Sequence, residues 1–163
     1  MKTKTLVFAA LLAAMAVALK FYSFTTLDYR FTFYDIPLMV TGIIFGPLAG
    51  GIAGFITDWI YALAHGYPLG IFTLSSIMWG FLPGLLMVVL RKVNVLTLIV
   101  IVLSTSVLAF LINTVALYVL LNGGIIAGLP ARIITMIIKW PIQVIVLKQV
   151  YERVILPLKI RRA

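Results

Sequence analysis

The chain of 163 residues contains no cysteine, one histidine and only four acidic residues. Without cysteine it can form no disulfide, no thiolate metal site and no cysteine nucleophile, and one histidine is too few for a histidine-based metal cluster. We therefore expect neither a metal nor a cofactor. The motifs H-E-x-x-H, G-x-S-x-G and G-x-x-x-x-G-K-[ST] are also absent, so no enzyme signature is present.

Charge of either sign is scarce. Charged residues make up 10% of the chain and hydrophobic residues 64%, with a mean hydropathy of +1.21, whereas soluble domains carry about 25% charged residues. A helix needs about 20 residues to cross the hydrocarbon core, so this length supplies about six helices with short connections. We predict an all-α integral membrane protein, with residues 1–163 forming a single domain that is a compact bundle of six transmembrane helices.

Six hydrophobic spans can be placed on the sequence. The second and third are short, and we expect them to tilt or to be only partly embedded. Lys2, Lys4 and the apolar run after them resemble a secretory signal, but we expect this segment to remain as the first span. The predicted spans cover residues 5–24, 34–48, 49–65, 70–90, 95–121 and 129–157.

The basic residues predict the orientation of the bundle. An even number of spans places both termini on one side, and eight of the 13 basic residues then fall on that side: Lys2, Lys4, Arg91, Lys92, Arg153, Lys159, Arg161 and Arg162. The positive-inside rule makes this side cytoplasmic. The net charge of +9 therefore reflects membrane topology, and we expect membrane lipid and no nucleic acid as a partner.

The stretch from Tyr29 to Pro47 brings charge into this apolar sequence. Arg30 lies among aromatic residues that include Tyr34. An arginine can bind a carboxylate with two parallel hydrogen bonds while aromatic faces stack on a planar ring. The alternative is an anchor at the membrane interface, with the guanidinium reaching lipid phosphate.

Asp58 lies within the third span, where a carboxylate must be paired, protonated or hydrogen-bonded. One reading is an internal ion pair with Arg30, Arg132 or Lys139. The other is a site role, in which Asp58 accepts hydrogen bonds from the amidine-like edge of a heterocycle.

Further polar residues follow in the last three spans. Hydroxyls and an indole lie about one turn apart where the fourth span begins, although such hydroxyls often bond only to their own helix backbone. Arg132 and Lys139 are seven residues apart and share a helix face. Asn113 is a costly polar group in lipid. The candidates in these spans are Phe72, Thr73, Ser75, Ser76, Trp79, Asn113, Arg132 and Lys139.

A strip of small residues follows one face of the first span. Ala10, Ala14 and Ala18 repeat every four residues, a spacing that lets another helix approach closely. The strip suits either packing within this chain or contact with a partner. The pairs Gly50 with Gly54 and Gly80 with Gly84 have the same spacing.

Taken in order, these segments resemble the substrate-binding S components of energy-coupling-factor (ECF) vitamin transporters, most closely the folate-specific branch. The resemblance lies in the alanine-rich first span, YRFTFYDIPLMVTGIIFGPLAGGIAGFITDW, FTLSSIMWGFLPGLL, Asn113-Thr114, and Leu129 to Arg132 followed by Lys139. Many folate-type chains read F-G-F-I-P where this chain has Phe33 to Pro37 as F-Y-D-I-P.

The resemblance implies a multi-pass protein of a prokaryotic cell membrane that captures a vitamin and has no ATPase of its own. It implies a transmembrane coupling subunit and two cytoplasmic ATPases as partners, with the strip of Ala10, Ala14 and Ala18 as the contact. For folate, we expect arginine or lysine to neutralise the carboxylates, Asp58 to bind the pterin, and Tyr34, Phe72 and Trp79 to stack on rings. Alternatives are another vitamin, such as pantothenate or riboflavin, or a structural membrane subunit whose polar residues pair internally.

Overall fold

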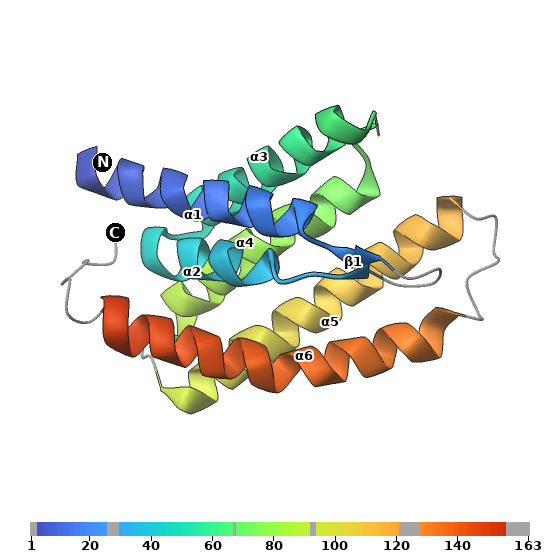
Figure 1. Cartoon of the computed structure of the whole chain (residues 1–163). Coiled ribbons are helices and arrows are strands. Elements are labelled where there is room, and N and C mark those ends of the chain that lie inside the picture. The colour runs from blue at the N-terminus through green and yellow to red at the C-terminus, as the bar shows by residue number, and fades with distance from the viewer. Residues whose placement is uncertain (1–2, 26–29, 67, 92–93, 121–127, 156–163) are drawn as a thin grey trace.

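The computed structural model describes residues 3–25, 30–66, 68–91, 94–120 and 128–155 and confirms the six predicted helices (Figure 1). They are α1 (Thr3–Phe21), α2 (Asp35–Phe45), α3 (Pro47–His65), α4 (Ile71–Leu90), α5 (Val95–Leu120) and α6 (Leu129–Val150). The last helix continues as one π-helical turn, η2 (Tyr151–Ile155). The predicted boundaries lie within a few residues of those observed, and the predicted end of the last span, at residue 157, lies outside the described residues.

A short hairpin between α1 and α2 was not predicted. Strand β1 (Phe24–Thr25) pairs antiparallel with β2 (Arg30–Phe31), so that Thr25 lies opposite Arg30. Two-residue strands are too short to leave an alternating pattern in a sequence. We call the end of the bundle at which this hairpin lies the hairpin end.

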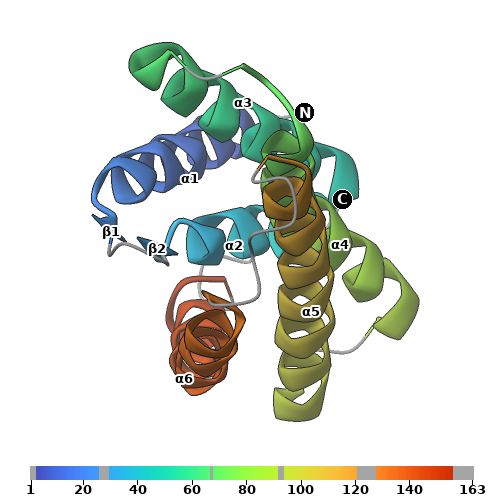
Figure 2. The ribbon, with the colours of Figure 1, turned by 90° about the vertical axis from the view of Figure 1, so that its right-hand side faces the viewer.

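Helix α2 lies at the centre of the bundle. Figure 2 shows α2 between α1 and α3 on one side and α6 on the other, with α4 and α5 along a third side. Its residues are buried except Ile36, which is partly buried. Eleven residues extend only about 16 Å, about half of the hydrocarbon thickness. Protein rather than lipid therefore surrounds α2.

Glycines allow α2, α3 and α4 to pack backbone against backbone. A Cβ atom built on Gly80 would lie 2.0 Å from the carbonyl oxygen of Gly50, and one on Gly42 would lie 2.0 Å from that of Gly80. A Cβ on Gly54 would lie 2.2 Å from the carbonyl oxygen of Ser76. The small-residue spacings seen in the sequence thus mark contacts within this chain.

The helices run back and forth between the two ends of the bundle. The start of α1 and the end of α6 lie together at the end opposite the hairpin, as do the α2–α3 and α4–α5 connections (Figure 1). Within the described residues, α3, α4, α5 and the last helix are long and apolar enough to cross a membrane. The cytoplasmic side stays a prediction, and Lys2, Lys92, Lys159, Arg161 and Arg162 lie outside the described residues.

Candidate functional site

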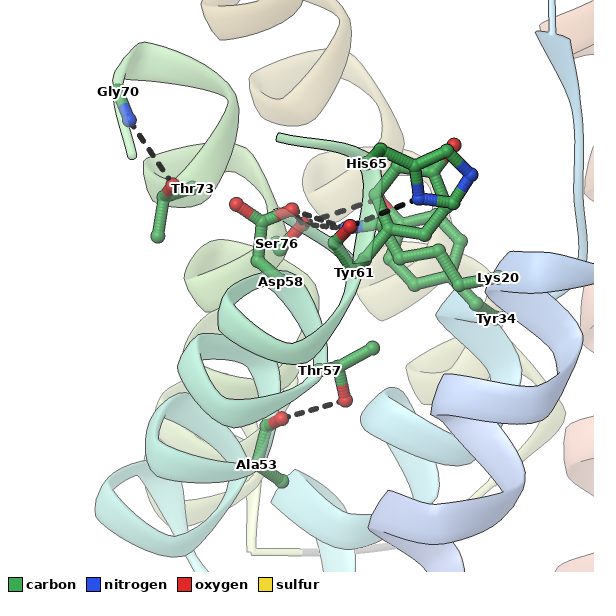
Figure 3. Close-up of polar contacts among 10 residues, drawn as sticks. All are labelled: Lys20, Tyr34, Ala53, Thr57, Asp58, Tyr61, His65, Gly70, Thr73 and Ser76. Carbon is green, nitrogen blue, oxygen red and sulfur yellow. Dashed lines mark hydrogen bonds and ion pairs between the residues drawn. The ribbon is translucent and has the colours of Figure 1, made fainter. Parts of the chain in front are cut away.

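A buried lysine at the end of α1 joins three helices near the hairpin end (Figure 3). The Lys20 side chain is only 6% exposed. Its ammonium donates to Oδ1 of Asp58 on α3 and, at 3.0 Å, to Oγ of Ser76 on α4. The Ser76 hydroxyl donates to the same Asp58 oxygen at 3.2 Å. The carboxylate is thus balanced by a cation from another helix.

Aromatic rings enclose this ion pair. The Lys20 ammonium lies 4.7 Å from the centre of the Tyr34 ring and 5.4 Å from that of Tyr61. The hydroxyls of Tyr34 and Ser76 are 3.5 Å apart. A desolvated ammonium gains about 2 kcal/mol from such a ring face, so the rings help to hold the charge away from water.

A second buried ion pair joins α2 to α6. Oδ2 of Asp35, a residue with no exposed surface, accepts from the Lys139 ammonium at 2.6 Å and from Nε2 of Gln143 at 2.5 Å. Its Oδ1 accepts from the backbone N–H of Ile36 at 3.2 Å. The carboxylate also lies in the first turn of α2, where the helix dipole favours negative charge.

Three aromatic rings surround Lys139. Its ammonium lies 6.0 Å from the Phe31 ring, 5.8 Å from the Phe33 ring and 5.9 Å from the Trp79 ring. Trp79 is itself buried and lies three residues after Ser76 on α4, while Tyr34 directly precedes Asp35. The two ion pairs therefore belong to one polar layer, formed by Lys20, Tyr34, Asp35, Asp58, Ser76, Trp79, Lys139 and Gln143.

Several buried polar atoms on α4, α5 and α6 have no hydrogen-bond partner within the described residues. Thr41, Thr57, Thr114 and Thr135 each donate at 2.7 Å to the carbonyl four residues earlier, but Thr105 does not. An unsatisfied buried group costs about 1–3 kcal/mol, so a polar ligand that reached these groups would be stabilised by them. The atoms are Oγ of Ser75 and Ser106, Oγ1 of Thr105, Nη1 of Arg132, Nε1 of Trp140 and Oε1 of Gln143.

Most of the predicted site residues fall in or beside this region. Tyr34, Asp58, Ser76, Trp79 and Lys139 belong to the polar layer. Arg132 is partly buried on α6, with its guanidinium carbon 5.2 Å from the Phe110 ring centre. Ser75 is buried, and its hydroxyl has no hydrogen-bond partner among the residues that the structure describes.

The other predicted residues are less closely connected to the layer. Phe72 is 41% exposed, and Asn113 is partly buried on α5. Oγ1 of Thr73 accepts from the backbone N–H of Gly70 at 3.2 Å, which closes the first turn of α4. The backbone of Arg30 lies in β2, but its side chain is outside the described part of the structure.

The sequence reasoning missed two members of the layer, Lys20 and Gln143, and it noted Asp35 only as a charge in the stretch from Tyr29 to Pro47. Asp58 does form an internal ion pair, but its observed partner is Lys20, whereas Lys139 holds Asp35. Of the partners suggested for Asp58, Lys139 is therefore wrong, and the side chain of Arg30 lies outside the described part of the structure. A count of charges inside the predicted spans would have indicated that Asp35 and Asp58 each need a cation, but not which cation each one takes. Lys20 also lies four and eight residues after Ala16 and Leu12, the buried face of α1.

The alanine strip faces outward. Ala10, Ala14 and Ala18 are exposed, while Leu12 and Ala16 face the bundle. The strip is therefore free to receive another helix within the described structure, and its role as a partner contact stays a prediction. No group of three or more His, Cys, Asp or Glu side chains that could hold a metal lies in the described ranges.

Comparison with known proteins gives both a family and a fold. A model of the family described as "ECF transporter, substrate-specific component" matches residues 4–151. The structure is similar to FolT bound with folic acid, with a TM-score of 0.82 and 24% identity over 94% of this chain and 96% of that one. No match was found among curated proteins.

Two further solved structures share this fold. The S component of a bacterial ECF transporter gives a TM-score of 0.72 and 22% identity, over 98% of this chain and 99% of that one. The S component for biotin from an ECF-type ABC transporter gives 0.68 and 19%, over 93% of each chain.

Proposed function

The chain belongs to the family of substrate-specific components of ECF transporters, and we propose that the vitamin it binds is folate. As a member, it is a multi-pass integral membrane protein that binds substrate for an ECF module and is not an enzyme. The similarity to FolT bound with folic acid supports the choice of vitamin.

The observation that carries the proposal is the set of buried polar atoms on α4, α5 and α6 that have no hydrogen-bond partner within the described residues. Folate offers a flat pterin with donors and acceptors, a benzoyl ring and two carboxylates. Within the described residues, Arg132 has a buried N–H without an acceptor, and hydroxyls on α4 and α5 also lack partners. A ligand of this kind would satisfy these groups, which an apolar substrate would leave unpaired.

Each part of folate has a matching group. Arg132, together with Arg30 and Lys139, would neutralise the carboxylates through charged hydrogen bonds. Asp58 would accept from the donor edge of the pterin. Tyr34 and Trp79 would stack on the rings, while Phe72, on the more exposed face of α4, would contribute at the margin. Ser75, Ser76, Thr73 and Asn113 complete the proposed set.

We further propose that the ECF module consists of a transmembrane coupling subunit and two cytoplasmic ATPases. Ala10, Ala14 and Ala18 would form the contact with the coupling subunit, because an exposed strip of small residues lets a second helix approach closely.

A titration of the purified protein with folate tests the assignment of the arginines. We expect folate to quench tryptophan fluorescence, since Trp79 and Trp140 lie in or beside the site. Arg132→Gln and Arg30→Ala should each weaken folate binding by more than about tenfold, the usual effect of losing one charged hydrogen bond. Arg153→Gln, at an exposed position, should leave the affinity unchanged. Equal affinity in all four proteins would reject these roles, and quenching by pantothenate or riboflavin alone would reject folate.

A further inference from the structure

We propose that Lys20 is a positioning residue of the substrate site, which holds the carboxylate of Asp58 in place and leaves one of its oxygens open to the pterin of folate. The inference rests on the proposed function but adds a residue outside the sequence motifs that suggested it. Lys20 lies on α1, whereas the predicted substrate contacts come from the segment between Arg30 and Tyr34 and from α3 to α6.

The two oxygens of Asp58 are used differently. Oδ1 accepts from both Lys20 and Ser76, which fills its two lone pairs. Oδ2 has no hydrogen-bond partner within the described residues, and Figure 3 shows it turned away from Lys20. One oxygen of the Asp58 carboxylate is therefore left for a ligand. This oxygen can accept hydrogen bonds from the donors of the pterin edge.

Lys20 is also the cation that balances this carboxylate. The Asp58 side chain is 11% exposed and the Lys20 side chain 7%, so neither charge is well hydrated. Removal of one partner of a buried ion pair leaves the other charge without its partner, so the carboxylate of Asp58 would no longer be held in the position from which it meets the pterin. Removal of Lys20 should thus weaken binding of the pterin without touching the ligand directly.

A simpler reading is that the ion pair only ties α1 to α3. That reading predicts that any change which restores the pair restores binding as well. Our proposal predicts instead that binding requires a carboxylate at position 58 with a cation at position 20. The two readings differ in the reversed pair Lys20→Asp with Asp58→Lys.

The experiment measures folate affinity and thermal stability for wild type, Lys20→Met, Lys20→Arg and the reversed pair. Lys20→Met should weaken folate binding by more than about tenfold, and Lys20→Arg, which keeps the charge, should recover most of that loss. The reversed pair should regain stability relative to Lys20→Met but not folate affinity. Recovery of affinity in the reversed pair would overturn the proposal.

A second ligand keeps the test decisive if the reversed pair does not fold. The fragment p-aminobenzoylglutamate lacks the pterin. Its affinity, measured by competition with folate, should therefore be the same for Lys20→Met as for wild type. Equal weakening of both ligands would overturn the proposal. Failure of wild type to bind folate would instead reject the proposed function, and Lys148→Met, at an exposed position, controls for the loss of a lysine.

Discussion

Replacement of Gly80 by alanine is expected to lower the thermal stability of the protein more than any other single methyl addition in the bundle. The new Cβ would lie 2.0 Å from the carbonyl oxygen, 2.4 Å from the carbonyl carbon and 2.9 Å from the Cα of Gly50. These are backbone atoms of α3 and cannot turn aside, so the two helices must separate. Overpacking of this kind costs about 3 kcal/mol or more, equivalent to a fall in Tm of roughly 10 °C.

Gly51 provides the matched control for this experiment. A Cβ there would lie 3.5 Å or more from side-chain atoms of Phe81 and Ile77, which is ordinary contact. Alanine is favoured over glycine inside a helix by up to about 1 kcal/mol, so Gly51→Ala should leave the Tm unchanged or raise it. Thermal unfolding in detergent, followed by intrinsic fluorescence, measures both variants. Equal Tm values for Gly80→Ala and wild type would contradict the close approach of α3 and α4.

The second large effect concerns the buried pair of Asp35 and Lys139. Removal of either charge leaves the other buried without a partner, which costs about 3–5 kcal/mol. Asp35→Leu and Lys139→Met should each lower the Tm by roughly 10 °C. The double variant should be more stable than either single variant, because an apolar pair of similar size can replace a buried ion pair at little cost. Thermal unfolding of the four proteins gives the coupling between the two residues.

Lys148 and Glu152 form the control pair. Their charged atoms are 3.9 Å apart and their side chains are 47% and 55% exposed. Exposed pairs contribute about 0–1 kcal/mol, so Lys148→Met should change the Tm by no more than about 3 °C. Additive effects of the Asp35 and Lys139 substitutions would contradict the ion pair that joins α2 to α6.

The same double variant separates stability from substrate binding. With both charges removed, the fold should persist while the aromatic rings around position 139 lose their cation. If Lys139 also contacts a carboxylate of the substrate, as we propose, the stable double variant should bind folate less tightly than wild type. The polar layer would then serve the fold and the substrate through the same residues.

The number and approximate limits of the helices could be predicted from the sequence, because long apolar runs separated by turn residues define spans through composition alone. The central position of α2 could not. Its 11 residues read as one more apolar segment, and only the packing of four other helices around it shows that it contacts protein and not lipid. The glycine spacings indicated close packing, but the choice between a partner and this chain required the observed contacts of Gly50 and Gly80.

The candidate site was predicted less completely than the fold. Asp58, Ser76, Trp79 and Lys139 were identified because polar residues are rare in the spans, and they do lie in one layer. The pairing between charges was wrong, since it depends on which helices are neighbours. α1 and α3 run in the same direction beside each other (Figure 1), so Lys20 reaches Asp58, a relation that no local pattern encodes.

Mass spectrometry of the small molecules released when the purified protein is denatured tests the central claim most directly. The protein should be purified without added vitamin, and the Gly80→Ala variant, whose helices cannot pack normally, serves as the control for non-specific carry-over. We predict folate in the wild-type extract in an amount close to that of the protein, and much less from the variant. An extract that contains pantothenate, riboflavin or another vitamin in place of folate would contradict the account.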